Sequence, residues 1–374
     1  MRDSEGRKEG RAAAEKATTK AVGKRRRSMT GSTRGELELF YSLIPEQHGR
    51  TICFRAARSS ALAIDFYCIP VDEDDDSPQP SYGAPPKRIV PFYCSTNISG
   101  SSSFAAVDKS MYCVGGHKTN GKGEETSAIY RFDTTGDNSG SWFRNSFDML
   151  CPRVAPSTVV IDGKLFVIGT QVVSDGAPLV EVFDPSSKYS LIVVSPPPPE
   201  SIRESMLFVT AALPDRNQIL VACTHANFAY LLDVKTGAWA QFDHNVDFAD
   251  ASGEAAVVLK TTMCWYNDRL LMLVAYDLNL KTWFKTSVKD LKRVGRRLKD
   301  ANGNYNFSLF PLDENHLCLL WADHVTPCLL HCTKVSVSLS HDRFCAAVAS
   351  SRSYVLRDES HFIDGLRFES QNVV

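Results

Sequence analysis

The fold class is decided by the stretch Ser157-Thr-Val-Val-Ile-Asp-Gly-Lys-Leu-Phe-Val-Ile-Gly169. Both halves of this stretch are rich in β-branched and aromatic residues, which favour strands. Asp162-Gly163 lies between them and supplies the positive φ angles that a two-residue hairpin turn requires. The stretch therefore predicts a tight antiparallel hairpin, and residues 111–115 and 219–223 resemble its returning strand.

A related pattern recurs along the chain with a period near 50 residues. Four short apolar runs end in an aspartate, and the aspartates are 51, 49 and 44 residues apart. An aromatic residue follows them after 9, 5, 6 and 6 residues. The four pairs are Asp133 with Trp142, Asp184 with Tyr189, Asp233 with Trp239, and Asp277 with Trp283. A period of this length predicts stacked structural repeats.

Each part of the repeat has a physical role. The aspartate is expected to begin a turn by accepting hydrogen bonds from the backbone N–H groups that follow it. The aromatic side chain is expected on the next strand, where it packs between neighbouring sheets. One unit cannot cover both of its faces, so the units must stack and close into a ring. We predict an all-β propeller of six four-stranded blades, with seven as the alternative, closed by a strand near residues 353–356.

Glycines complete the pattern upstream of the first two aspartates. Gly115-Gly116 precedes the first, and Gly163 with Gly169 precedes the second. With Cys151-Pro-Arg153 and Phe183-Asp184-Pro185, these residues resemble a kelch repeat of the plant F-box/kelch-repeat proteins. The resemblance is strong over residues 104–190 and recognisable out to Trp283. It implies a kelch β-propeller and, by relationship to the F-box proteins, a ubiquitin-ligase substrate adaptor. Residues 1–40 show no F-box pattern, so the adaptor role is a hypothesis only.

The chain divides into a tail and a propeller. Residues 1–34 hold 11 Lys/Arg against 4 Asp/Glu with few large apolar residues, which predicts a disordered basic tail. Its Lys24-Arg25-Arg26-Arg27 cluster is either a nuclear import signal or a solvated run. Residues 35–374 are assigned to the propeller, and residues 72–88 to an acidic, proline-rich surface insertion in which no paired strand is expected.

Composition limits the functional classes. The net charge of −1 gives no overall bias toward nucleic acid, and no apolar run approaches the roughly 20 residues of a membrane-spanning helix. The 11 cysteines are scattered through apolar runs, which suits buried thiols in a reducing compartment. We expect a monomer in the cytoplasm, the nucleus or both.

No pattern of catalytic, cofactor-binding or metal-binding residues stands out. His324, Cys328, His331 and Cys332 are the one dense group of metal-ligand types. On a strand, His331 points away from the face that the two cysteines share, so we expect ordinary strand packing and no metal. Gly115-Gly116 is followed by no Gly-Lys-Ser/Thr ending, so a phosphate loop is not expected.

The candidate binding residues lie in the loops of one face. Arg153 and Arg203 precede the first strands of their blades, and His117, Lys118 and Lys122 lie in a loop on the same predicted face. In kelch relatives that bind acidic peptides, arginines at this rim point toward the central channel. Arginine suits that role because its planar group pairs with carboxylates through two hydrogen bonds.

The expected function is therefore non-catalytic binding of a protein or peptide partner through the loop face. The alternative is a propeller-based hydrolase or oxidase with an active site at the channel mouth. A third hypothesis is salt-sensitive nucleic-acid association through the basic tail.

Overall fold

The computed structural model describes residues 50–58, 63–71, 85–119, 122–134, 140–169, 178–187, 192–194, 208–223, 228–242, 256–267, 272–291, 307–322, 326–340, 343–358 and 360–369. The basic tail, most of the acidic insertion, Tyr189 and Arg203 lie outside these residues. In the part that is described, no helix has the length and apolar character needed to cross a bilayer.

The described chain is built from strands with one short 3-10 turn, η1, at Pro214–Arg216. The strands are β1 Arg50–Arg58, β2 Ala63–Val71, β3 Lys87–Arg88, β4 Tyr93–Ser95, β5 Ser103–Val107, β6 Ser110–Val114, β7 Ile129–Asp133, β8 Trp142–Arg144, β9 Ser157–Ile161, β10 Lys164–Ile168, β11 Val180–Phe183, β12 Ile192–Val194, β13 Phe208–Leu213, β14 Gln218–Cys223, β15 Phe228–Asp233, β16 Trp239–Gln241, β17 Val257–Leu259, β18 Thr262–Asn267, β19 Met272–Asp277, β20 Thr282–Ser287, β21 Phe307–Pro311, β22 His316–Ala322, β23 Leu329–Ser340, β24 Arg343–Val355 and β25 Ser360–Glu369.

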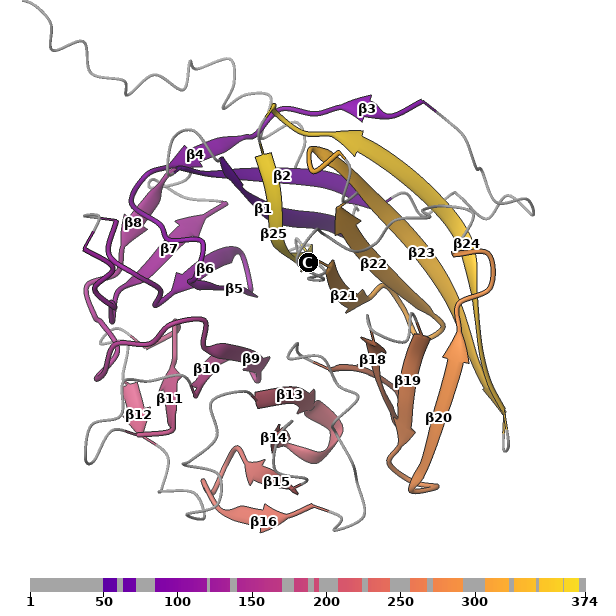
Figure 1. Ribbon diagram of the computed structural model, residues 1–374. Coiled ribbons are helices and arrows are strands. Elements are labelled where there is room, and N and C mark those ends of the chain that lie inside the picture. The colour runs from indigo at the N-terminus through magenta and orange to yellow at the C-terminus, as the bar shows by residue number, and fades with distance from the viewer. Residues whose placement is uncertain are drawn as a thin grey trace, which may run out of the picture.

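These strands form six sheets around a centre, which is the arrangement of a six-bladed β-propeller (Figure 1). Blade one has the order β25-β1-β2-β4, and blades two to five are the consecutive groups β5–β8, β9–β12, β13–β16 and β17–β20. Blade six is β21–β24 with β3 added at its edge. The prediction of six four-stranded blades is confirmed, apart from this fifth strand in blade six.

The hairpin that suggested the fold is present as predicted. Strands β9 and β10 pair in register from Ser157 with Ile168 to Ile161 with Lys164. Asp162 and Gly163 have φ angles of 50° and 68°, as a tight hairpin turn requires. The returning strands expected near residues 111 and 219 are β6 and β14.

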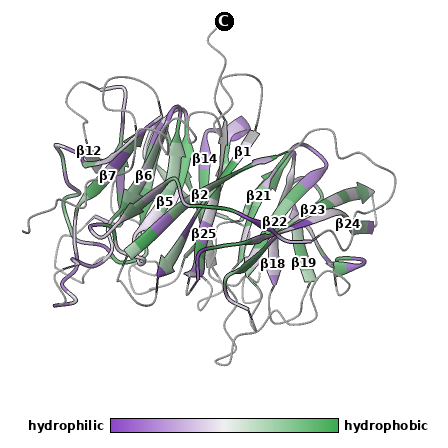
Figure 2. Ribbon diagram, turned by 90° about the horizontal axis from the view of Figure 1, so that it is seen from above, coloured by the Kyte–Doolittle hydropathy of each residue, from purple (hydrophilic) through white to green (hydrophobic). Residues whose placement is uncertain are grey.

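The core consists of six apolar clusters, and each lies between two neighbouring blades. The central strand β6 shows how this arises. Met111 and Cys113 pack against blade one, whereas Tyr112 and Val114 pack against blade three. Because side chains alternate along a strand, a central strand buried on both faces is apolar throughout. Figure 2 views the ring from its side and shows hydrophobic residues concentrated in the strands.

Three of the four repeated aspartates, and the tryptophans, also have the predicted roles. Asp184, Asp233 and Asp277 each accept a hydrogen bond from the backbone N–H two residues later, at 2.9–3.1 Å. Trp142 and Trp239 lie on the outermost strands β8 and β16 and pack in clusters shared with the preceding blade. Trp283 on β20 does the same. Asp133 instead accepts hydrogen bonds from Ser110 at 2.6 Å and Arg131 at 2.5 Å.

Two details of the prediction are wrong. Residues 353–355 do not close the ring, because they pair with residues 329–331 inside the long hairpin of β23 and β24. The closing strand is β25, which pairs with β1. Lys87 and Arg88, predicted to be unpaired, form β3 and pair in parallel with Tyr354 and Val355. An outer edge strand offers free backbone groups to such a short segment, even after two prolines.

Candidate functional site

The expected binding face is organised by the paired glycines after β6. Gly115 and Gly116 have φ angles of 70° and 96°. The N–H of Gly116 donates to the carbonyl oxygen of Arg153 at 2.7 Å. A Cβ on Gly115 would overlap that same oxygen, and a Cβ on Gly116 would lie 2.8 Å from the amide nitrogen of Ser102. Glycine is needed here because three chain segments meet at this point.

A cavity of about 480 Å³ opens beside these glycines, at the end of the strands where blades one, two and three connect. We call it the His117 cavity. Its lining includes Ser99, His117, Lys118, Glu125, Tyr130 and Arg144. These side chains come from the connection between blades one and two and from the β6–β7 loop and outer strands of blade two. His117 and Lys118 were predicted from the sequence, whereas the other lining residues were not, because nothing in their local sequence marks them.

The loop that carries His117 is fixed by backbone hydrogen bonds. Lys118 donates to the carbonyl of Glu124 at 2.6 Å, and Thr126 donates to the carbonyl of Gly116 at 2.9 Å. The Nδ1 atom of His117 lies 2.8 Å from the Oγ atom of Ser101. The imidazole is thus oriented by the neighbouring connection, as binding residues on a rigid scaffold commonly are.

Two exposed ion pairs border the cavity. The ammonium group of Lys118 lies 3.0 Å from the carboxylate of Glu124, and Arg144 pairs with Asp148. Lys118 is 53% exposed and Arg144 is 58% exposed. Exposed pairs of this kind contribute only about 0–1 kcal/mol, so a ligand carboxylate can replace the protein carboxylates. Lys122 is exposed in the same loop but is not part of the cavity lining.

The prediction for Arg153 is wrong, because its side chain is buried inside the protein and is not available to a binding partner. It is fully buried and forms an ion pair at 2.9 Å with Glu181, which is also buried. The same guanidinium donates to the carbonyls of Gly169 at 2.8 Å and Pro178 at 2.6 Å. Glu181 accepts in addition from the N–H of Leu150 at 2.6 Å. Arg153 therefore holds the connection between blades two and three, and it shapes the cavity only through its backbone.

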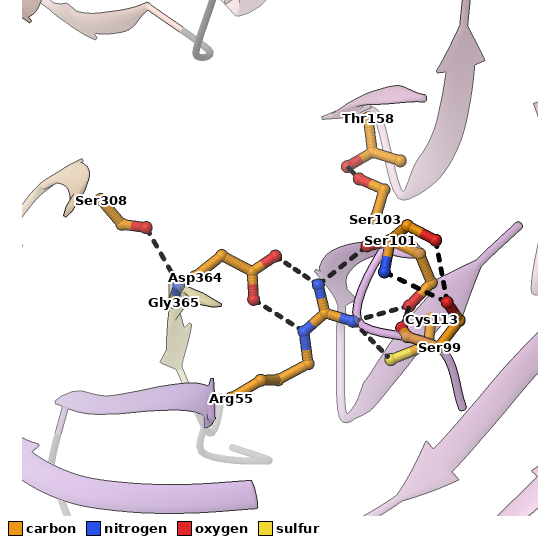
Figure 3. Close-up of polar contacts among 10 residues, drawn as sticks. Arg55, Ser99, Ser101, Ser103, Cys113, Thr158, Ser308, Asp364 and Gly365 are labelled. Atoms are coloured by element: carbon orange, nitrogen blue, oxygen red, sulfur yellow. Dashed lines mark hydrogen bonds and ion pairs between the residues drawn. The ribbon is translucent and has the colours of Figure 1, made fainter. Parts of the chain in front are cut away.

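A second buried arginine ties the site to the closing strand (Figure 3). Arg55 of β1 is fully buried and forms a two-point ion pair with Asp364 of β25. It also donates to the hydroxyl of Ser102 at 2.6 Å and to its carbonyl at 2.8 Å. Ser102 in turn donates to the carbonyl of Ser99, which lines the cavity. Ring closure and the cavity wall thus share one hydrogen-bonded network.

The charge states in this network follow from burial and pairing. Burial by itself would lower the pKa of Arg55, but the carboxylate of Asp364 and the neighbouring Cys113 together outweigh it and raise the pKa above its ordinary value. Burial raises the pKa of the nearby Cys113 thiol to about 12. Arg55 is therefore charged and Cys113 neutral near neutral pH.

The candidate metal ligands of the sequence do not form a metal site in the part of the chain that is described. His331 lies in β23, and its ring stacks on that of Trp321 with 4.1 Å between the ring centroids. The described residues contain no cluster of metal-binding side chains.

Comparisons with known proteins add little to this geometry. No family model and no curated protein matches the sequence. The chain resembles the solved structure of YjhT, with 11% identity over 66% of this chain and 83% of that chain and a TM-score of 0.44. It also resembles a chain of a nidogen/laminin complex, with 9% identity, 86% and 100% coverage and a TM-score of 0.47. For Hsv2 of Kluyveromyces lactis, identity is 7%, coverage 70% and 76%, and the TM-score 0.41. These identities and TM-scores are too low to support an argument. The assignment of the fold as a six-bladed β-propeller therefore depends on the strand order of this chain.

Replacing Gly115 with alanine is expected to destabilise the protein more than replacing Gly163. Both glycines have φ near 70°, so each substitution carries the same backbone cost of about 1–3 kcal/mol. Only at Gly115 does the new Cβ meet a backbone atom, because the space around Gly163 is open within 4 Å. Thermal unfolding of the two variants measures the difference. Equal melting temperatures would show that the close approach to Arg153 is unimportant.

Proposed function

We propose that this chain is a non-catalytic protein-interaction module that binds a segment of a partner protein in the His117 cavity. The observation that carries the proposal is the convergence of His117, Lys118, Tyr130 and Arg144 on one concave site. Rigid polar and aromatic groups in such a cavity recognise a peptide with little loss of entropy on binding. The exposed cations favour a segment that carries carboxylates.

The resemblance to kelch repeats supports the same proposal at a finer level. The glycine pair and the repeated aspartates and tryptophans occupy turns and interfaces that recur from blade to blade. We infer that this chain is a kelch-type propeller that binds its partner on the face that carries the His117 cavity. For its biological role, the hypothesis is that the chain is a diverged relative of ubiquitin-ligase adaptors. Fold alone does not assign function, so the partner must be identified directly.

The test compares partner capture by wild type and by a Lys118→Glu/Arg144→Glu variant. Reversing two exposed charges at the cavity is expected to reduce capture of a specific partner at least 10-fold. The matched control is Lys235→Glu/Arg343→Glu, which changes the same residue types at exposed positions outside the cavity. Equal capture by the cavity variant and the control would refute the proposal. Ubiquitin-ligase subunits among the lost partners would support the adaptor hypothesis.

A second candidate is hydrolysis, and one observation favours it. Ser101 lies within hydrogen-bonding distance of His117, which is the relation of a nucleophile to its base. If the site is catalytic, wild type should hydrolyse an activated ester such as p-nitrophenyl acetate, and Ser101→Ala should abolish the turnover. If wild type and Ser101→Ala hydrolysed the ester at the same rate, the site would not be catalytic and binding would remain the proposed function.

A further inference from the structure

A second cavity opens at the opposite end of the strands. It measures about 550 Å³ and is lined by turns of blades four and five and by Pro311 of blade six. We call it the Lys260 cavity. The His117 cavity lies where the second strand of a blade leads to the third, whereas the Lys260 cavity lies where the first strand leads to the second. Because the strands are antiparallel, the two cavities face away from each other, and neither depends on the other.

The floor of the Lys260 cavity is apolar and belongs to the core between blades four and five. Leu213, Ala256 and Leu278 are buried there, with 3%, 7% and 8% exposure. Val258 packs against the same cluster and is partly buried. Leu213 and Val258 lie in paired strands, and the N–H groups of Ala256 and Leu278 donate to backbone carbonyls at 2.8 Å, so the floor is formed before any ligand arrives. A preformed cavity of this volume and character is typical of small-molecule sites.

Lysine at position 260 is unexpected for the turn in which it lies. Lys260 follows β17 directly, as Asp108 follows β5 and Asp162 follows β9. All three have positive φ angles, 53° for Lys260 and 50° for each aspartate. Asn217 in the corresponding turn of blade four has a φ of 51°. Aspartate and asparagine tolerate this conformation better than lysine does. Strained backbone conformations cluster at functional sites, and Lys260 lines this cavity.

Arg216 adds a second cation to the same lining. It donates one hydrogen bond to the amide oxygen of Asn279 at 3.3 Å. Lys260 pairs at 2.8 Å with Glu314, and both side chains are more than half exposed. Asp215 is the acidic group in the lining. The weak exposed pair of Lys260 can be exchanged for a ligand carboxylate, since such pairs contribute little.

We propose that the Lys260 cavity binds a small apolar carboxylate, with its hydrocarbon part on the floor formed by Leu213, Ala256 and Leu278 and its carboxylate on Lys260 and Arg216. The apolar part gains by leaving water, and the two cations select its charged end. The ligand is a free small molecule, since the volume of the cavity is that of a small-molecule site.

The probes for the test are octanoate, the neutral octanamide and the cationic octylamine, titrated calorimetrically against the full chain. Octanoate is expected to bind at least 10-fold more tightly than octanamide, and octylamine most weakly. In methyl NMR spectra, octanoate should shift signals of Leu213, Val258 and Leu278. Octanamide binding as tight as octanoate binding, or no shift at these methyl groups, would overturn the proposal.

Two variants locate the charge selection. Arg216→Ala/Lys260→Ala is expected to weaken octanoate binding about 10-fold and to leave octanamide binding unchanged. Lys118→Ala/Arg144→Ala, on the other face, should change neither. If the first variant kept its affinity for octanoate, or if the second variant lost it, the carboxylate would not bind at Arg216 and Lys260.

Lys260→Asn separates binding from stability. Asparagine relieves the positive φ, so Tm should rise by about 1–3 °C while octanoate affinity falls. A fall in Tm would overturn the argument that lysine is strained here and retained for a ligand.

Discussion

Replacing Arg153 with methionine is expected to lower the free energy of unfolding by about 3–5 kcal/mol. The substitution keeps most of the volume but removes the charge that faces Glu181, and both side chains are at most 2% exposed. The carboxylate then remains buried without its cation, which is the costly half of a buried ion pair. The carbonyls of Gly169, Leu179 and Pro178 also each lose the hydrogen bond from Arg153. Urea denaturation followed by circular dichroism measures the loss.

Two further variants test the cause of this effect. Arg131→Met removes a partly exposed arginine that pairs with Asp133, and it is expected to cost less than about 1 kcal/mol. Arg153→Met/Glu181→Met removes both buried charges and should be more stable than Arg153→Met alone. If Arg153→Met cost no more than Arg131→Met, Arg153 would not be the residue that holds blades two and three together.

Removal of β25 is expected to have a larger effect, loss of the cooperatively folded ring. A chain ending at Asp358 lacks the innermost strand of blade one, and β1 then keeps β2 but loses the second of its two partner strands along its whole length. Phe362 packs toward blade six and Leu366 toward blade two, so two interfaces are opened at once. Arg55 also loses Asp364 and remains a buried cation. An open ring exposes sheet edges and apolar faces, which favour aggregation.

Size-exclusion chromatography and thermal unfolding distinguish the outcomes. The shortened chain should elute as aggregates and show no sharp transition. The control ends at Glu369, keeps all of β25 and should melt at the wild-type temperature. A cooperative transition at that same temperature for the chain ending at Asp358 would show that β25 does not close the ring.

Much of the architecture could be predicted because its causes are local. The turn at Asp162-Gly163 needs two residues of the right kind, and the repeated Asp and Trp positions recur at a nearly constant period. The predicted closing strand near residues 353–356 precedes the true one, β25. Both segments have the sequence character of a strand, so the local sequence does not distinguish them. The partner of residues 353–355 is decided by the length of the hairpin between β23 and β24, which no single stretch specifies.

The candidate site was only partly predictable for the same reason. His117 and Lys118 were found because they follow a recognisable glycine pair. Arg144 and Ser99 reach the cavity from other segments, and their neighbouring residues carry no signal. The position of Arg153 before a strand predicts an exposed binding residue, but its environment depends on Glu181, 28 residues further along.

The sequence by itself determined the all-β class, the four recognisable repeats and the hairpin turns, because alternation and turn chemistry act between near neighbours. Tertiary structure alone decided that Arg55 meets Asp364 across 309 residues and that β3 leaves blade one for blade six. It also decided which loops enclose the His117 and Lys260 cavities. These features depend on how a closed ring brings distant segments together, and ring closure is a property of all six blades at once.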